Sequence, residues 1–361
     1  MNRPTHSTPG LVCAHHHLYS ALARGMPAPP RQATQFSEIL EQVWWRLDCA
    51  LDLEMIEWSA KLGALEAIES GTTAIIDHHE SPNAIEGSLS AIAEACAEVG
   101  VHLRAAYGVT DRHTTPGHVN ITPQPSASIR PDRMTDAARR GLAENERFLR
   151  AGGQGYVGVH AAFSCSHETI DAAADLAQQL GVGVHVHVAE GPLDDDAGAR
   201  WRKHATDDWL IVHAVHLSGE LPGTLAHNPR SNMNNAVGYA APALRSNRIV
   251  LGTDGIGADM LDEFRVAYVR HRESNVLASP DTAWSWLTNG WDLVPEALAD
   301  NVTWTYDTME PWHLAFSTGV RPQQVEIGGT VVFENGVHLT NDAARIRAKA
   351  AEQAQRLFAL L

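Results

Sequence analysis

Histidines and carboxylates gather at the ends of several short apolar runs of this chain. The run "LVCAHHH" ends in His15, His16 and His17. Side chains two residues apart in a strand point to the same side, so His15 and His17 can converge on one point while His16 faces away. Three later runs, "VHVHVAE", "IVHAVH" and "GTDG", supply further groups of the same kind: His185, His187, Glu190, His213, His216 and Asp254.

Imidazole and carboxylate groups are the ligands that a catalytic zinc ion takes, with one position left open for water. For the histidine triplet alone, a polar strand end without a metal is the favoured alternative. For His185, the alternative is a histidine inside the fold whose ring nitrogens have hydrogen-bond partners. For His216, it is a residue that forms hydrogen bonds within a loop. The agreement of four separate strand ends nevertheless favours a metal site.

These apolar runs alternate with segments of helical periodicity. Strands are expected at residues 10–15, 72–79, 101–109, 155–163, 182–190, 209–216, 223–229 and 248–255, and helical segments at 37–70, 87–100, 135–152 and 168–181. Eight strands alternating with helices indicate an α/β fold of the (β/α)8 TIM-barrel class, whose site residues lie at the C-terminal strand ends. A doubly wound sheet is the rival, but no G-x-G-x-x-G loop follows the first strand.

Composition limits the classes of partner. The 361 residues carry 27 Lys and Arg against 43 Asp and Glu, a formal charge of −16, which argues against nucleic acid and against an anionic membrane surface. The four cysteines show no CxxC spacing, no signal segment opens the chain, and no run is long enough to span a bilayer. We expect a cytoplasmic protein that acts on a small molecule.

Several longer motifs resemble those of a known family. The segments "PGLVCAHHHLYSALARG", "SGTTAIID", "HVHVAEG", "VHAVHL", "HNPRSNMNNAVG" and "LGTDG" look like the successive motifs of the amidohydrolase superfamily. Within it they are most similar to the branch of aminohydrolases and chlorohydrolases that includes guanine deaminase. "LYSALARGMP", "DHHESPNAIEGSL" and "TDGIGADMLDEFRVAY" further resemble the SsnA-type aminohydrolases. The resemblance covers residues 9 to 275 and is specific for the branch, not for the substrate.

The resemblance implies a ligand set and a reaction. One divalent metal ion, expected to be Zn²⁺, would be held by four residues: His15, His17, His187 and Asp254. Such an ion lowers the pKa of its water to about 7. Asp254 would take the proton of the attacking water, with His213 beside it, and Glu190 matches the family's proton shuttle to the ring nitrogen. Ammonia would be the product.

Four further residues are candidates for substrate contact: Trp44, His78, His227 and Asn232. Trp44 could stack on a flat heterocycle, or pack in the core. His78 could line the pocket or form a polar strand end. His227 and Asn232 belong to the "HNPRSN" motif, so contact with the substrate and a purely structural role both remain open for them.

The resemblance also predicts two parts, a barrel over residues 9–290 and a tail over residues 300–361. The tail reads as a remnant of the family's β-sandwich domain, with a hairpin at 325–339 around Asn335-Gly336 and an amphipathic helix at 342–361. The N-terminal sandwich strands are expected to be absent, through a true deletion or a misplaced start. The barrel flank that the sandwich normally covers would then favour a homo-oligomer.

The function expected from these residues is hydrolytic deamination of a small nitrogen heterocycle, such as a purine, pterin or pyrimidine-like ring. Hydrolysis of a cyclic amide, a formimidoyl group or an aryl chloride by the same nucleophile is an alternative, and so is a non-catalytic metal-binding protein. The negative charge disfavours polyanionic substrates. Three arginines near strand ends could still hold one carboxylate or lie at the surface: Arg24, Arg112 and Arg230.

Overall fold

Eight parallel strands form the inner layer of the computed structural model, which describes residues 6–113 and 131–361. They are β2 (Leu11–His16), β3 (Thr72–His79), β4 (His102–Tyr107), β5 (Val157–Ala161), β6 (Val184–Val188), β7 (Leu210–His213), β8 (Thr224–His227) and β9 (Arg248–Leu251). Strands β2 to β4 form one parallel sheet and β5 to β9 another, and single bridges, Val109 to Val159 and His16 to Asp254, join the two sheets at both seams. The predicted (β/α)8 class is confirmed.

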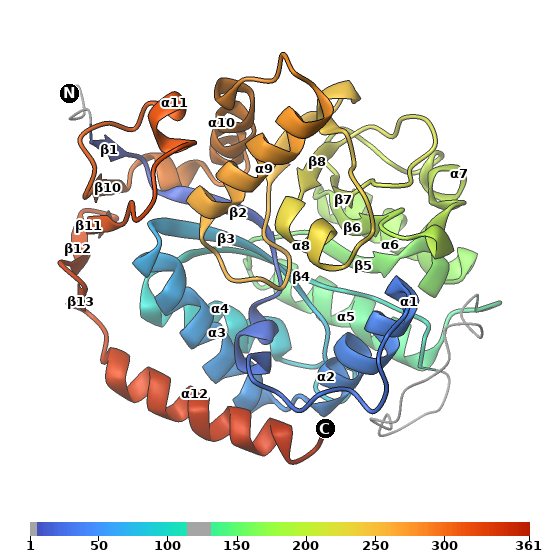
Figure 1. The fold of residues 1–361 in the computed structure, drawn as a ribbon. Coiled ribbons are helices and arrows are strands. Elements are labelled where there is room, and N and C mark those ends of the chain that lie inside the picture. The colour runs from blue at the N-terminus through green and yellow to red at the C-terminus, as the bar shows by residue number, and fades with distance from the viewer. Residues whose placement is uncertain (1–5, 114–130) are drawn as a thin grey trace.

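Alternate strand residues fill the inside of the barrel. Val12, Ala14, Ala74, Ile76 and Val212 belong to one buried cluster to which β2, β3, β7, β8 and β9 all contribute. The strands are buried on both faces because helices cover the outside, as parallel sheets require. Figure 1 shows these helices arranged around the strands. The inside of the barrel is therefore a packed core.

The covering helices follow the predicted segments, with one interruption. The segment 37–70 is divided into α1 (Phe36–Ile39), a π-helical turn η2 (Leu40–Trp44), α2 (Trp45–Ala50) and α3 (Leu53–Glu69). Asp52 ends the run, because its side chain accepts a hydrogen bond from the backbone N–H of Met55 and caps α3. The other three segments form α4 (Ser88–Val99), α5 (Asp136–Arg150) and α6 (His167–Leu180).

Shorter helices complete the outer layer. The α-helices are α7 (Ala197–Trp201), α8 (Pro229–Asn234), α9 (Met260–Ser274), α10 (Pro280–Thr288) and α11 (Pro311–Leu314). The 3-10 helices are η1 (Leu18–Ala23), η4 (Ala162–Ser164), η5 (Pro192–Asp194), η6 (Pro242–Leu244), η7 (Asn289–Asp292) and η8 (Pro295–Leu298). None of the helices within the described ranges is both long and apolar enough to cross a membrane.

A second, antiparallel sheet lies beside the barrel. Its order is β1 (Ser7–Thr8), β10 (Asn301–Trp304), β11 (Pro322–Ile327), β12 (Thr330–Glu334) and β13 (Val337–His338). Asn335 and Gly336, with φ of 49° and 85°, form the predicted turn between β12 and β13, and a further turn at Gly328-Gly329 joins β11 to β12. The division into a barrel of residues 9–290 and a tail of residues 300–361 stays a prediction.

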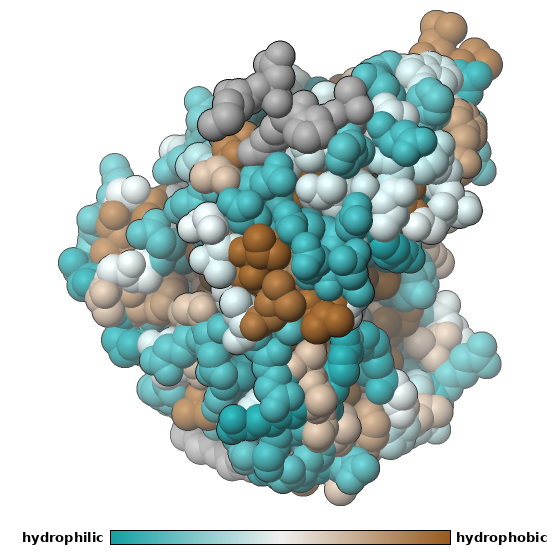
Figure 2. Space-filling view, turned by 90° about the vertical axis from the view of Figure 1, so that its left-hand side faces the viewer, coloured by the Kyte–Doolittle hydropathy of each residue, from teal (hydrophilic) through white to brown (hydrophobic). Residues whose placement is uncertain are grey.

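The chain ends in α12 (Ala343–Phe358), which runs along α3 (Figure 1). Arg347 and Arg356 of α12 pair with Glu69 and Asp52 at the two ends of α3. Figure 2 views the side on which the antiparallel sheet lies and shows a compact hydrophobic patch surrounded by polar residues. At the edge of that sheet, Val337 is 58% and Leu339 53% exposed.

Candidate metal centre

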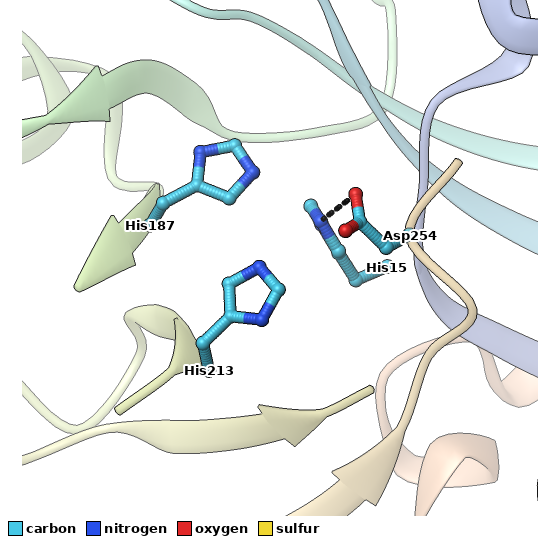
Figure 3. A group of neighbouring side chains, drawn as sticks. All are labelled: His15, His187, His213 and Asp254. Carbon is cyan, nitrogen blue, oxygen red and sulfur yellow. Dashed lines mark ion pairs between the residues drawn. The ribbon is translucent and has the colours of Figure 1, made fainter. Parts of the chain in front are cut away.

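Four strand ends bring His15, His187, His213 and Asp254 together. Each residue offers one nitrogen or oxygen atom that could bind a metal ion, and these four atoms all lie within 4.8 Å of one another. All four residues are buried. His15 lies near the end of β2, His187 in β6 and His213 at the end of β7, while Asp254 follows β9. Figure 3 shows the side chains facing a common space, with the ion pair between His15 and Asp254 drawn as a dashed line.

His17 faces the same space. Its Nε2 lies 2.9 Å from Asp254 Oδ1 and 3.3 Å from His187 Nε2. The structure therefore places all four predicted ligands, His15, His17, His187 and Asp254, next to one another. His213, predicted to lie beside the attacking water, offers a ring nitrogen within 4.8 Å of the ligand atoms of His15, His187 and Asp254.

A bulge in β2 turns the two histidines inward. Val12 and Ala14 already point into the barrel, so a regular strand would place His16 inside and His15 outside. The register of β2 against β3 shifts between Cys13 and His16, which reverses this alternation. His16 instead bonds through its Nδ1 to the Thr253 hydroxyl, at 3.0 Å.

The ring orientations leave Nε2 of three histidines directed at the shared space. Nδ1 of His17 lies 2.5 Å from the carbonyl oxygen of His78, and Nδ1 of His187 lies 2.8 Å from that of His160. Nδ1 of His213 lies 2.8 Å from Asn232 Oδ1. Only a protonated Nδ1 can donate to these oxygens. Each of these rings, once neutral, therefore presents an unprotonated Nε2, as metal-binding histidines do.

The residues fit a divalent cation. Nε2 of His15 and Nε2 of His213 are buried without a hydrogen-bond partner in the structure, an uncommon state for buried polar atoms. Neutral imidazoles beside one carboxylate are the donors that zinc selects. His185 supports His15, whose Nδ1 lies 2.9 Å from His185 Nε2, and burial lowers the pKa of both rings well below the usual histidine range.

Two site residues adopt a left-handed backbone. His213 has φ of 69° and Asp254 of 56°, and Ala189 and Ala214 beside the strand ends share this conformation. Left-handed conformations cost non-glycine residues about 1–3 kcal/mol each and cluster at functional sites. This strained conformation changes the direction of the His213 side chain. The neighbouring Val212 packs inside the barrel, so in a regular strand His213 would face outward, but it faces the site.

Two carboxylates of the site have opposite pKa shifts. Burial raises the pKa of Asp254, but the neighbouring imidazoles of His15 and His17 outweigh it and hold the pKa well below the usual range. Burial and the nearby Asp254 charge raise the pKa of Glu190 well above its usual range. Glu190 Oε2 lies 3.6 Å from His213 Nε2. One carboxylate is thus kept ionised and the other protonated, the arrangement that general acid–base catalysis requires.

A cleft with an empty volume of about 710 Å³ opens onto these groups. His17, His187, Glu190 and Asp254 line one part of it, and Trp44 lines it as well. Most of the remaining wall is aromatic or polar: Tyr19, Phe36, Trp45, Phe163, Asp48, Glu80, His160, Asp194 and Asn235. The sequence offered no signal for most of these residues, because they come from loops and from the divided helix region.

The other three candidates for substrate contact do not line this cleft. His78 lies beneath it, with its Nε2 3.1 Å from the carbonyl oxygen of Val159. Asn232 holds His213, as described above. His227 is fully buried beside the rings of Tyr239 and Trp286. These placements favour supporting roles for all three.

Comparison with known proteins gives matches to one family. A model described as "Amidohydrolase family" matches residues 7–289. The 5'-deoxyadenosine deaminase of Methanopyrus kandleri is 29% identical over 73% of this chain, and the match spans 61% of that protein. The 5-methylthioadenosine/S-adenosylhomocysteine deaminase of Syntrophomonas wolfei is 27% identical over 97% of this chain and 86% of its own.

A solved structure shows the same fold. The crystal structure of an adenosine deaminase from Xanthomonas campestris with bound zinc superposes with a TM-score of 0.76, covering 97% of this chain and 85% of its own at 19% identity. The resemblance inferred from the sequence motifs is confirmed by these matches.

Proposed function

Because this chain belongs to the amidohydrolase family, we propose that it is a metal-dependent aminohydrolase. It hydrolyses a carbon–nitrogen bond of a small nitrogen heterocycle and releases ammonia. The observation that carries this proposal is the meeting of His15, His17, His187 and Asp254 at three strand ends, with Glu190 held beside them. Both named relatives act on adenosine derivatives, so an aminopurine is the first substrate class to test.

The metal-binding residues and the two carboxylates have different roles in the proposed reaction. A divalent ion, zinc in the solved relative, lowers the pKa of water to about 7 and so supplies a nucleophile at neutral pH. Asp254, ionised in the buried site, accepts a proton from the attacking water. Glu190, kept protonated by burial, donates a proton to the ring nitrogen. His213 presents its unprotonated Nε2 to the same space and accepts a hydrogen bond from the attacking water.

The cleft suits a flat heterocycle. Like ordinary ligand pockets, it combines aromatic side chains with a few polar groups. Trp44, Trp45, Tyr19 and Phe163 provide aromatic faces along it, which bury a ring and keep bulk water away from the reacting carbon. This wall gives the predicted stacking role of Trp44 a physical basis.

The proposal extends to a homo-oligomeric assembly and a cytoplasmic location. A homo-oligomer would cover the exposed Val337 and Leu339 at the edge of the antiparallel sheet. The four cysteines are free and buried, which suits the reducing cytoplasm.

The proposal predicts ammonia release by the zinc-loaded protein from one class in a panel of aminopurines, their nucleosides, pterins and aminopyrimidines. Asp254→Asn serves as the control, because it removes both a ligand and the proton acceptor. Ammonia release that the variant abolishes supports the proposal. Absence of ammonia from every compound, with zinc still bound, would move the function to hydrolysis of another bond or to metal binding alone.

A further inference from the structure

A buried ion cluster forms part of the cleft wall and has no part in the chemistry above. Arg112 Nη2 lies 2.8 Å from Asp48 Oδ2 and 2.5 Å from Glu80 Oε2. Asp48 belongs to α2, Glu80 follows β3 and Arg112 lies beyond β4. The three side chains are only 2–5% exposed. Two carboxylates share one guanidinium, so the cluster offers no unpaired positive charge to the cleft.

The position of Glu80 is built into the barrel. Gly108 makes room for it, because a Cβ at Gly108 would lie 2.9 Å from Glu80 Cγ and 3.1 Å from Glu80 Oε1. Glu80 Oε1 lies 3.8 Å from Nε2 of His160, too far for a hydrogen bond. Burial lowers the pKa of His160 well below its usual range, so this ring is neutral and does not compensate the carboxylate.

A second group beside the cluster lacks a partner. Trp45 lines the cleft, is more than nine-tenths buried, and packs its ring 4.4 Å from the guanidinium carbon of Arg112. Its Nε1 has no hydrogen-bond partner among residues 6–113 and 131–361. Buried indole N–H groups usually find one, so a polar ligand beside Glu80 would also satisfy this N–H group.

The described part of the cleft wall contains no lysine or arginine. Its lining includes Asp48, Glu80, Glu190, Asp194 and Asp254 but neither lysine nor arginine. Arg112 lies behind the wall and is occupied by the two carboxylates. The other two arginines that could have held a substrate carboxylate are engaged elsewhere, Arg24 with Glu66 and Arg230 with Glu263.

We propose that Glu80 determines substrate specificity: its Oε1 accepts a hydrogen bond from a hydroxyl or amino group on the substituent of the heterocycle, and the same carboxylate excludes substrates whose substituent carries a phosphate or carboxylate. The substrate class is thus an uncharged or cationic heterocycle. This inference rests on the proposed deamination and narrows the range of substrates expected for it. A like charge brought beside a buried carboxylate is repelled more strongly than in water, because the surroundings are less polarisable.

Three adenosine analogues that differ only at the 5' position, where they carry a cationic, a neutral or an anionic group, test this inference. They are 5'-amino-5'-deoxyadenosine, 5'-deoxyadenosine and adenosine-5'-carboxylate. Dissociation constants are measured by calorimetry, and kcat/KM by ammonia release, at about pH 8, above the pKa of about 7 to which burial raises Glu80. We expect the carboxylate to bind about 10–100-fold more weakly than the other two compounds.

Matched variants assign the discrimination to Glu80. Glu80→Gln keeps the size of the side chain and is expected to reduce the preference against the carboxylate about tenfold, whereas Glu80→Asp, which keeps the charge, retains most of it. Glu86→Gln removes the same charge from an exposed pair with Arg140 and is expected to change nothing. A thermal melt of each variant shows that it is folded.

Two results would overturn the inference. Equal affinity of the wild-type protein for all three compounds would do so even if Glu80→Gln failed to fold. An equal effect of Glu80→Gln and Glu86→Gln would assign the discrimination to the overall negative charge instead. Because binding is measured separately from turnover, failure to release ammonia from any compound would count against the proposed function, while the binding order would still decide the role of Glu80.

Discussion

Replacement of Glu190 by glutamine is expected to lower kcat about 10²–10⁴-fold, while the protein keeps its bound metal. The side chain keeps its size but loses the proton that burial and Asp254 hold on it. Glu190 contacts His213 and is no predicted ligand, so zinc affinity should not change. The measurement pairs ammonia release with zinc content in the same preparation.

Glu146→Gln is a suitable control for Glu190→Gln. Glu146 pairs with Arg150 on the exposed side of α5, so its neutralisation removes the same charge far from the chemistry. We expect wild-type kcat from this control. A Glu190→Gln protein with wild-type kcat would show that another group delivers the proton, and a variant without zinc would show that Glu190 helps to hold the metal.

Replacement of His17, a predicted metal ligand, by alanine is expected to lower zinc affinity strongly. Loss of a residue that only supports a ligand typically lowers metal affinity roughly 10–100-fold, and we expect a larger decrease here. His17 Nε2 lies 2.9 Å from Asp254 Oδ1, and the carbonyl of His78 fixes its ring. Burial lowers the pKa of His17, but Asp254 outweighs it and raises the pKa to about 9, so in the metal-free protein a proton links the two. Zinc would displace this proton. Competition with a chromogenic chelator measures the affinity.

His213→Ala provides the comparison for His17. His213 faces the same space, and its Nε2 is 3.6 Å from Glu190 Oε2, so we expect this variant to lose activity but to keep most of its zinc affinity. The reverse result, a normal affinity in His17→Ala and a large loss in His213→Ala, would replace His17 by His213 in the ligand set.

The barrel and the identity of the clustered residues follow from local sequence pattern. All eight strands lie at the predicted runs, because strands buried on both faces are almost continuously apolar. Chemistry-bearing residues at the strand ends are equally visible, since the C-terminal ends of parallel strands meet at one face. His15, His17, His187 and Asp254 could therefore be predicted to lie together.

The backbone features that direct these side chains into the site could not be predicted from the sequence. The bulge that turns His15 and His17 inward depends on pairing between β2 and β3. The left-handed conformations of His213 and Asp254 are uncommon even for these residue types, so the sequence does not predict them. The cluster of Arg112 with Asp48 and Glu80 joins three separate segments. The two-residue strand β1 is too short to show any periodicity.

Ammonia release before and after removal of the metal tests the central claim most directly. One preparation is treated with a chelator, desalted, assayed on the best compound of the panel, and assayed again after addition of one equivalent of zinc per chain. The account predicts that activity falls at least about 100-fold without metal and returns with zinc. Undiminished ammonia release from protein shown to be free of metal would contradict it.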